Sequence, residues 1–572
     1  MHEIYHNASV VIIWLGPDPN CEALLVREFF RALLQKYYTD SDVYNSAIMK
    51  YKTDWLHLDN EEFSLASSGL PPLDASIWRS VVDFWERSWF SRAWVRSEAA
   101  VAQRIEIYCG DVDFTLDEIV ETSRFHVWSG LGDTLMTLKK GVPEVSMSVT
   151  GRTVGCSAVG IEDLQMWAGG ITYTEAEDQK LVADQLTGPR TEQKHPLLRE
   201  FAVSLFLSRR DDASDARDKV LALLVLMRRM SASYEVDELP LELDYAMSLE
   251  EVYRKATAWV IKDSGCLGMI CLLEPDRMEV AASHWPPWVP DYRSPPPTLL
   301  RLFDTEIGEQ SRLRATSDDD LRPRIQEKEL HVHAQYMGTV SDIGDTYSSM
   351  IVHGCFELNA RVLLNCPRIM PNGVDRLDAW RKLFSRDEDP SAIEDPPSTD
   401  SSYTPSDHPS SRASFKNWFI FYIIRAVRQA YYEGRIKSFR EHLAKMPMFE
   451  LLAECEDGDH KMLPDLGFWQ KSFNEPTSLA RITGHRPRFR TVEISGRRLF
   501  RMKSPICLGI GPEGMLEGDE VWCAATATLP LVLRKVEIPT DCEDAAPGTY
   551  VVVGEAYFRD VDKVANTIPG EE

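Results

Sequence analysis

The first residues of the chain have the spacing of a zinc-hydrolase motif. The segment from His2 to His6 reads H-E-x-x-H, a pattern in which two histidines one helical turn apart bind zinc and the glutamate activates a water molecule. Ser9 and Ile12 stand where the extended H-x-x-G-x-x-H form needs its glycine and third histidine. No upstream sheet is available to hold a substrate. We therefore expect no metal site, and zinc hydrolysis by His2, Glu3 and His6 is the least favoured alternative.

Two other pairs of metal-binding or nucleophilic residues have weaker patterns. His331 and His333 share one face of a predicted strand, and two histidines alone do not complete a metal site. Cys266 and Cys271 follow a predicted helix without a histidine nearby. The chain contains no G-x-S-x-G, P-loop or kinase motif, so these reaction classes have no support in the sequence.

Two further motifs indicate structure rather than chemistry. Arg217 and Asp218 stand at the start of a strongly apolar helix, and we expect them to form an ion pair that orients it, because such groups are rarely buried unpaired. The run from Gly509 to Pro512 reads G-I-G-P and lies between predicted strands. A phosphate-binding loop precedes a helix, so we predict a simple turn here.

The N-terminal region has the pattern of an α/β unit. The run from Val10 to Leu15 is apolar and rich in β-branched residues, which predicts an interior strand of a parallel sheet. Only nine residues precede it, so either upstream strands are missing or the partner strands come later. Helices are expected at about 22–38 and 74–87, and a strand at 105–107 before a turn at Gly110.

The rest of the chain changes from helical to β patterns. The stretch from Val220 to Met227 is nearly all apolar and predicts a central helix. Ser248 with Glu251 forms a capping box, and Gly265 would end the helix that it opens. Residues 329–340 alternate as a strand does. Four short strands then follow, as in a small barrel or sandwich, at 499–502, 520–526, 531–536 and 550–558.

The composition limits the partners and the compartment. The 572 residues predict about three globular units. The net charge of -26 disfavours binding to nucleic acid and anionic membranes. Eleven cysteines without C-x-x-C spacing indicate reduced thiols. The chain shows no signal peptide and no run long enough to span a bilayer, so we expect a cytoplasmic protein.

A series of short blocks, in order along the chain, points to one known family. M-x-x-I-Y with W-L-G, W-F-x-R-x-W-V, D-x-R-D-K-V, E-V-Y and W-V-P-D all occur. These blocks resemble the fungal heterokaryon-incompatibility (HET) family, and they stand at 1–16, 89–98, 215–224, 243–253 and 287–291. Segments between 497 and 557 resemble the family's C-terminal β module. The resemblance implies a fungal protein connected to non-self recognition and regulated cell death.

The chain departs from the family pattern in two places. The family's Y-x-A-L-S-Y-x-W-G and W-x-D-x-x-C-I-N-Q strands have no counterpart here, and Ser97 replaces the glutamine that precedes the family's glutamate. We therefore expect an N-terminally truncated HET domain that lacks the first strands of its sheet.

The resemblance also implies a candidate catalytic residue, Glu98. HET domains are distantly similar to Toll/interleukin-receptor-like domains, some of which cleave NAD with a glutamate in an S-x-W-C-x-x-E stretch. The segment from Ser91 to Glu98 has comparable spacing. The carboxylate would engage the ribose hydroxyls while nicotinamide departs from an oxocarbenium-like centre. The alternative is a structural glutamate paired with Arg92 or Arg96, and the missing strands would remove much of a nucleotide cleft.

We therefore predict an α/β plus α+β multidomain protein with a partial Toll/interleukin-receptor-like unit. The predicted parts are a partial HET domain at 1–111, a helical region at 112–300, the start of a β module at 301–350, a disordered linker at 386–414, a helical insertion at 415–480, and a C-terminal β module, a small barrel or sandwich, at 488–560. We expect a non-catalytic family protein without a cofactor. The alternative is an NAD-cleaving enzyme that uses Glu98. Its partner would be an unidentified protein, a second copy or a nucleotide, and neither nucleic acid nor membrane.

Overall fold

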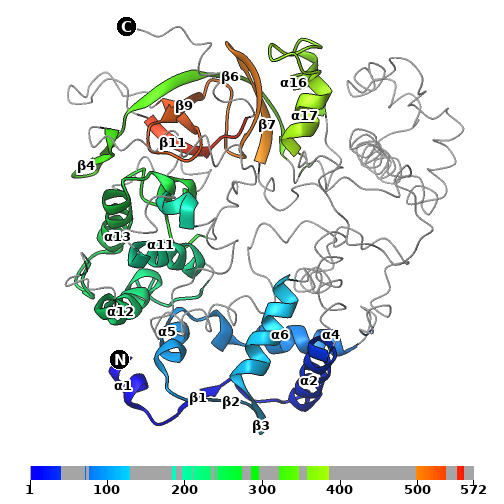
Figure 1. Cartoon of the computed structure of the whole chain (residues 1–572), viewed down its shortest axis with the longest axis vertical. Coiled ribbons are helices and arrows are strands. Elements are labelled where there is room, and N and C mark those ends of the chain that lie inside the picture. The colour runs from blue at the N-terminus through cyan, green and yellow to red at the C-terminus, as the bar shows by residue number, and fades with distance from the viewer. Residues whose placement is uncertain are drawn as a thin grey trace, which may run out of the picture. The chain divides into compact units, whose positions relative to one another are not determined.

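The structure is a computed structural model, and it divides the chain into two compact units (Figure 1). It describes residues 2–39, 71, 76–128, 183–188, 196–209, 211–233, 239, 241–273, 285–294, 321–346, 349, 357–384, 497–535 and 550–558. The first unit comprises Met1–Glu274, Glu279–Pro297 and Arg314–His333, and the second Pro275–Met278, Thr298–Leu313 and Ala334–Glu572. Within the described residues, no helix combines the length and the apolar character that crossing a membrane requires.

The N-terminal part of the first unit is a three-stranded sheet with helices packed on one face. The central strand β2 pairs in parallel with β1, Val11 opposite Ile105, and antiparallel with β3. The chain runs through α1 (His2–Asn7), β1 (Val11–Trp14), α2 (Ala23–Thr39), α4 (Ser76–Trp85), the 3₁₀ turn η2 (Ser88–Ser91), α5 (Ala93–Val101), β2 (Ile105–Cys109), β3 (Val112–Phe114) and α6 (Leu116–Trp128). The helices predicted near 22–38 and 74–87 are confirmed as α2 and α4.

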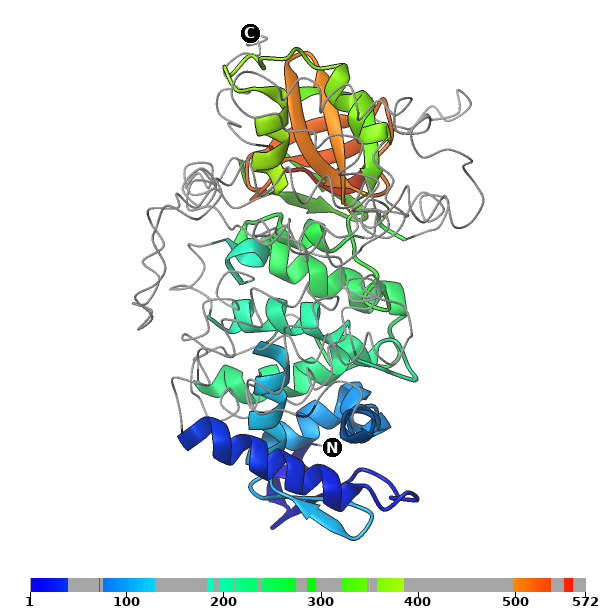
Figure 2. The ribbon, with the colours of Figure 1, turned by 90° about the vertical axis from the view of Figure 1, so that its right-hand side faces the viewer.

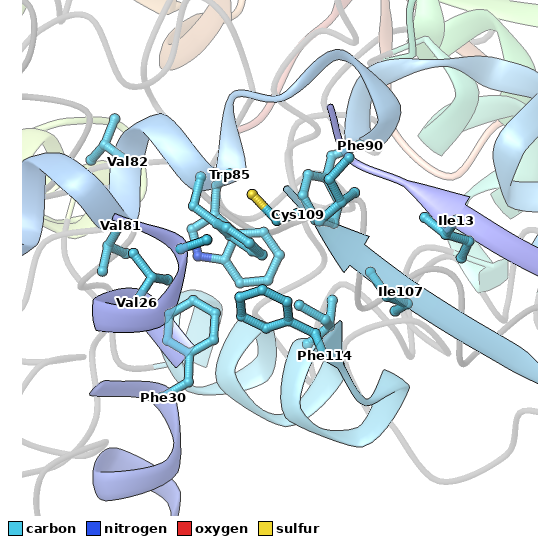
Figure 3. Packing of buried hydrophobic residues seen from close by; sticks show 14 of the residues in the cluster. Ile13, Val26, Phe30, Val81, Val82, Trp85, Phe90, Ile107, Cys109 and Phe114 are labelled. Carbon is cyan, nitrogen blue, oxygen red and sulfur yellow. The ribbon is translucent and has the colours of Figure 1, made fainter. Parts of the chain in front are cut away.

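An aromatic core joins the covered face of this sheet to α2 and α4 (Figure 3). Phe30 of α2 stacks on Trp85 of α4, with ring centroids 5.7 Å apart. Phe90 packs against Trp85 at 5.0 Å, and Ile107 of β2 closes the cluster from the sheet. Aromatic pairs of this kind stabilise a core beyond the area that they bury. The segment around Phe90 is therefore first of all a packing element.

The prediction of an interior strand at Val10–Leu15 is only partly right. A strand forms and pairs in parallel, but in the described sheet β1 is an edge strand. Val11 and Ile13 are buried, whereas Ile12 and Trp14 on the opposite face are 62% and 55% exposed. Parallel strands are usually covered on both faces. The sequence could not predict this open face. Both faces of the strand carry hydrophobic residues, so nothing in the run distinguishes the covered face from the uncovered one.

The helical part of the first unit is built around one buried helix. This part contains α11 (Pro196–Ser208), α12 (Asp218–Ser233), α13 (Leu249–Ser264), the 3₁₀ turn η4 (Gly268–Leu272) and a hairpin of β4 (Arg324–Gln326) and β5 (Glu329–His331). The run from Val220 to Met227 is buried throughout, which confirms the predicted central helix. Ser248 caps α13 by accepting the Glu251 N–H, and Gly265 ends it with φ +67°, so the capping prediction is also confirmed.

The second unit is built on a six-stranded sheet of order β11-β10-β9-β6-β7-β8. Its helices α16 and α17 lie beside this sheet (Figure 2), where α16 packs on β6 and β7, and α17 on β8. The elements are β6 (Ala334–Thr346), α16 (Glu357–Leu364), α17 (Arg376–Phe384), β7 (Arg497–Lys503), β8 (Ile506–Pro512), β9 (Glu520–Ala524), β10 (Leu531–Lys535) and β11 (Tyr550–Glu555). The single strand predicted at 329–340 is in fact divided between β5 and β6.

The second unit departs from two expectations. Of the predicted barrel or sandwich, the barrel is not formed, because the described strands do not close the sheet, although an antiparallel bridge joins Ile510 of β8 to Tyr557 beyond β11. The run from Gly509 to Pro512 is not a turn but the second half of β8. A Cβ at Gly509 would lie 2.5 Å from Cζ of Phe500, so glycine is required there by the ring that packs against the strand. The linker predicted at 386–414 and the helical insertion predicted at 415–480 lie outside the described residues.

Candidate functional site

Glu98 lies on α5 and faces Tyr5 of the N-terminal helix. The Tyr5 hydroxyl on α1 lies close to the Glu98 carboxylate. Burial raises the pKa of Tyr5, the Glu98 charge raises it further, and the nearby Arg92 guanidinium opposes the rise. Arg92 stands immediately before α5, and the side chain of Arg96 is outside the described set. The site therefore consists of a phenol, a carboxylate and a guanidinium close together.

This site lies at the amino ends of the two parallel strands. α1 ends at Asn7, just before β1, and α5 ends at Val101, just before β2. Gln103 Nε2 donates to the His6 carbonyl oxygen at 3.1 Å, which fixes one helix end against the other. Figure 1 shows α1 and α5 at one end of β1 and β2, with α2 at the other. Ligands of open α/β sheets bind outside the carboxyl ends of the strands, so Glu98 is at the opposite end.

The carboxyl end of β1 is occupied by an acidic cap. Asp18 accepts the N–H groups of Glu22 and Ala23, each at 3.0 Å, and so caps α2. A helix N-terminus attracts an anion such as phosphate, but here the Asp18 carboxylate already takes that place. A Cβ at Gly110, whose φ is +56°, would lie 2.9 Å from Cβ of Asp18, so the β2–β3 turn packs directly on the cap.

Arg87 is the basic residue at this end of the sheet, and its contacts are to the backbone. Its Nη1 donates to the carbonyl oxygens of Leu15 at 3.1 Å and Pro17 at 2.8 Å. These bonds fix the chain where it leaves β1, next to Gly16 with φ +101°. A guanidinium used in this way holds the loop in place, so a nucleotide phosphate would have to compete with two existing hydrogen bonds.

The block from Trp89 to Glu98 is also connected to the helical part of the unit. Ala93 N–H donates to the Asp212 carbonyl oxygen at 2.9 Å, and Asp212 N–H donates back to Ser91. Phe90 belongs to the aromatic core. Backbone hydrogen bonds to Asp212, in the segment that precedes α12, therefore position Ser91 and Ala93 at the start of α5. α5 is the helix that carries Glu98.

A second group of residues, which we call the polar knot, lies at the start of α12. The polar knot comprises Asp215, Arg217, Asp218, Lys219, Tyr245 and Tyr253. Arg217 pairs with Asp215 at 2.6 Å and also donates to the Tyr245 carbonyl oxygen at 2.7 Å. Asp218 instead accepts the Tyr245 hydroxyl at 2.6 Å. The predicted ion pair between Arg217 and Asp218 is therefore wrong, because the arginine turns back to Asp215.

Lys219 and Tyr253 complete the polar knot from the buried side. The Lys219 ammonium donates to the carbonyl oxygens of Ser208, Arg209 and Asp211 at 3.4, 3.1 and 2.6 Å. It thus satisfies carbonyls at the C-terminal end of α11. The Tyr253 hydroxyl donates to the Ala216 carbonyl oxygen at 2.6 Å. The D-x-R-D-K and E-V-Y blocks, far apart in the sequence, meet here as one hydrogen-bonded structure.

The other predicted sites are not brought together. His6 has its Nδ1 3.4 Å from the Val101 carbonyl oxygen, and the His2 side chain is outside the described set. In the part of the chain that the structure describes, no three His, Cys, Asp or Glu side chains gather as metal ligands. His331 contacts Glu329 at 3.2 Å. Burial raises the pKa of the Cys266 thiol to about 11, which leaves it a poor nucleophile at neutral pH.

Two important residues were not singled out in the sequence. Tyr5 stands in the first family-like block, so its pairing with Glu98 could have been sought between the two blocks. Asp18 follows Gly16-Pro17 and precedes a predicted helix, which is the ordinary signal of an N-cap. In both cases the signal was present, and the chemical partner became visible only in three dimensions.

The comparisons with known proteins identify the N-terminal segment. The family model described as "Heterokaryon incompatibility protein (HET)" matches residues 1–98. The match begins with the α1 segment that carries Tyr5 and ends at Glu98 itself. No curated protein and no solved structure matches the chain.

Proposed function

We propose that this chain, whose residues 1–98 are a heterokaryon incompatibility domain, acts without catalysis in fungal non-self recognition and regulated cell death. The observation that carries the proposal is the position of Glu98, which lies on α5 beside Tyr5 of α1 at the amino ends of β1 and β2. A catalytic glutamate would need to face a ligand cleft, and such clefts lie at the carboxyl ends of open α/β sheets. In this proposal Glu98 fastens α1 to α5.

The occupied carboxyl end of the sheet supports the same proposal. Asp18 holds the N-terminus of α2, and Arg87 is bonded to the Leu15 and Pro17 carbonyl groups. A negatively charged cap repels a phosphate rather than binding it. The parallel pair of β1 and β2, with helices in the connection between them, is the arrangement expected of a partial Toll/interleukin-receptor-like unit.

The partner that we propose is a protein, with a second copy of the chain included. The uncovered face of β1 exposes Ile12 and Trp14, and apolar side chains next to an open strand edge favour contact with another polypeptide. The net charge of -26 is in keeping with a protein partner rather than nucleic acid.

The test is an NAD-depletion assay with purified full-length protein. We expect no loss of NAD by liquid chromatography over hours at micromolar protein, and the same result for Glu98→Ala and for Glu3→Ala, an exposed control on α1. NAD loss by the wild type that Glu98→Ala abolishes and Glu3→Ala leaves intact, with both variants folded, would establish the NAD-cleaving alternative and refute our proposal.

A further inference from the structure

Three aromatic side chains gather on the outer face of the six-stranded sheet in the second unit. Tyr336 of β6 stands opposite Trp522 of β9 in the ladder, with ring centroids 5.3 Å apart. Tyr550 of β11 lies 5.6 Å from Trp522. Val521 and Val532 point into the core. Side chains alternate along a strand, so Trp522 projects from the other face.

A carboxylate lies among these rings. Trp522 Nε1 donates to Oε2 of Glu520 at 2.9 Å. The Tyr550 hydroxyl lies near the same carboxylate, and burial together with Glu520 raises the pKa of Tyr550. The indole N–H is a neutral donor, so it orients the carboxylate without cancelling its charge. Lys535, opposite Tyr550 in the ladder, forms no ion pair with Glu520, and no other basic side chain of the described segments does.

We propose that Tyr336, Trp522, Tyr550 and Glu520 form a binding site for the ammonium group of a lysine side chain on a partner protein. Aromatic faces attract alkylammonium cations through their quadrupole, and the carboxylate supplies a full negative charge and free lone pairs. Tyr336 is 39% exposed, so a partner can reach the site. The charge of -26 on the whole chain draws basic partners toward it.

The ring geometry favours a cation over a sugar. The planes of Tyr336 and Trp522 meet at 68°, and those of Trp522 and Tyr550 at 64°. Steeply inclined rings present no flat platform on which a pyranose could stack. They can instead form the walls of a corner around a compact cation, with Glu520 on the same face.

The experiment uses saturation-transfer NMR with the full chain and a short Gly/Ser peptide that contains one lysine. Two matched probes accompany it: the same peptide with norleucine, which keeps the alkyl chain and lacks the charge, and methyl glucopyranoside. We expect saturable binding of the lysine peptide and no signal from either control. The lysine methylene groups next to nitrogen should receive the strongest transfer, since they would lie against the rings.

Variants connect the binding to this site. Glu520→Gln removes the charge, and Tyr336→Ala removes the most exposed ring, and each should weaken lysine-peptide binding by roughly tenfold. Glu517→Gln is the matched control, because Glu517 is an exposed carboxylate in the turn before β9. It should bind as the wild type does. Thermal unfolding confirms that each variant is folded before binding is compared.

Three results would overturn the proposal. Equal binding of the norleucine peptide would show a merely apolar patch. Binding of the glucopyranoside without the lysine peptide would show a sugar platform. Lysine binding that Glu520→Gln and Tyr336→Ala both leave unchanged would place the cation elsewhere on this acidic protein. Because the site is in the second unit, none of these results bears on catalysis by Glu98.

Discussion

The polar knot and the Tyr5–Glu98 contact both join family-like blocks that are far apart in the sequence, yet they differ in how densely they are bonded. In the polar knot, Arg217 and Lys219 donate to carbonyl groups of several segments, and two tyrosine hydroxyls add further bonds. At Glu98, the partner found among the described side chains is one phenol, that of Tyr5. Family-like blocks therefore form many hydrogen bonds with each other in the polar knot, and few at Glu98, where the contact is also half-buried.

A sequence motif can exist because it stabilises the fold or because it binds a ligand, and this difference distinguishes the two cases. Every polar residue of the knot has a partner within the chain, so a structural role explains the D-x-R-D-K block without any ligand. Lys219 is only 6% exposed, and a buried ammonium is stable only when its protons are bonded. The Glu98 carboxylate does not need a partner from the protein, because a half-exposed carboxylate can also accept hydrogen bonds from water. If the comparison is right, substitutions in the polar knot should cost more stability than any at Tyr5 or Glu98.

The largest effect is expected from Lys219→Met. The methionine keeps the length and loses the ammonium, so the carbonyl groups of Ser208, Arg209 and Asp211 lose a donor at the end of α11. We expect the free energy of unfolding to fall by about 3 kcal/mol, measured by urea denaturation followed by circular dichroism. The control is Lys262→Met on the exposed side of α13, which should change it by under about 0.5 kcal/mol. Equal effects would contradict a structural role for Lys219.

Tyr253→Phe should have the next largest effect. Its hydroxyl donates to the Ala216 carbonyl oxygen in a part-buried hydrogen bond, and the tyrosine itself is fully buried, so water replaces the lost donor poorly. We expect a loss of about 1–2 kcal/mol by the same measurement. Tyr245→Phe removes the bond to Asp218, but Tyr245 is 45% exposed and should cost less. If Tyr245→Phe lowered the free energy of unfolding more than Tyr253→Phe, the polar knot would depend more on its exposed than on its buried tyrosine.

Acid should weaken the polar knot through Asp215. The hydrogen bond from Arg217 holds the pKa of Asp215 below its ordinary value. The folded pKa is thus lower than the unfolded one, so the stabilisation is fully present above about pH 4 and is lost as pH falls through the lower folded value. Asp215→Asn should flatten the stability profile over this acidic range in a urea-denaturation series. An unchanged acid slope in the variant would mean that Asp215 titrates alike in both states.

The sequence predicted those parts of the fold that depend on local patterns. Ser248 with Glu251 and the run at Val220–Met227 were read correctly, because capping and burial on all sides leave a signature within a few residues. The open face of β1 and the open sheet of the second unit were missed. Ile12 and Trp14 look like core residues in a linear pattern, and barrel closure depends on strand register and stagger between distant segments.

The candidate site was predictable to a lesser degree. Glu98 was identified from its block with Arg92 or Arg96 as the expected partner; its proximity to Tyr5 was not predicted, and the Arg96 side chain lies outside the described set. Side-chain pairing across elements depends on how α1 packs against α5, which no local spacing specifies. Pairing between residues that are close in sequence is equally hard to predict. Asp215 and Asp218 are both near Arg217 in the sequence, and only the start of α12 at Asp218 determines which carboxylate the Arg217 side chain can reach.

The smallest effect is expected from Tyr5→Phe, and its pH dependence distinguishes the contact from the polar knot. The variant keeps the ring and removes the hydroxyl that lies beside Glu98, so at neutral pH it should cost under about 1 kcal/mol. The pKa of Tyr5 is raised by burial and by Glu98, so the stabilisation is present below about pH 10 and is lost as pH rises through the folded value. Tyr5→Phe should therefore reduce the loss of stability in alkali and leave the acid slope unchanged. The hydrogen bond from the Tyr108 hydroxyl to Glu106 likewise raises the pKa of Tyr108, so Tyr108→Phe on the same sheet is a positive comparison that should also reduce the loss of stability in alkali. If Tyr5→Phe destabilises the protein as much as Lys219→Met does, Glu98 belongs to a structural joint as essential as the polar knot, and the difference drawn between the two regions disappears.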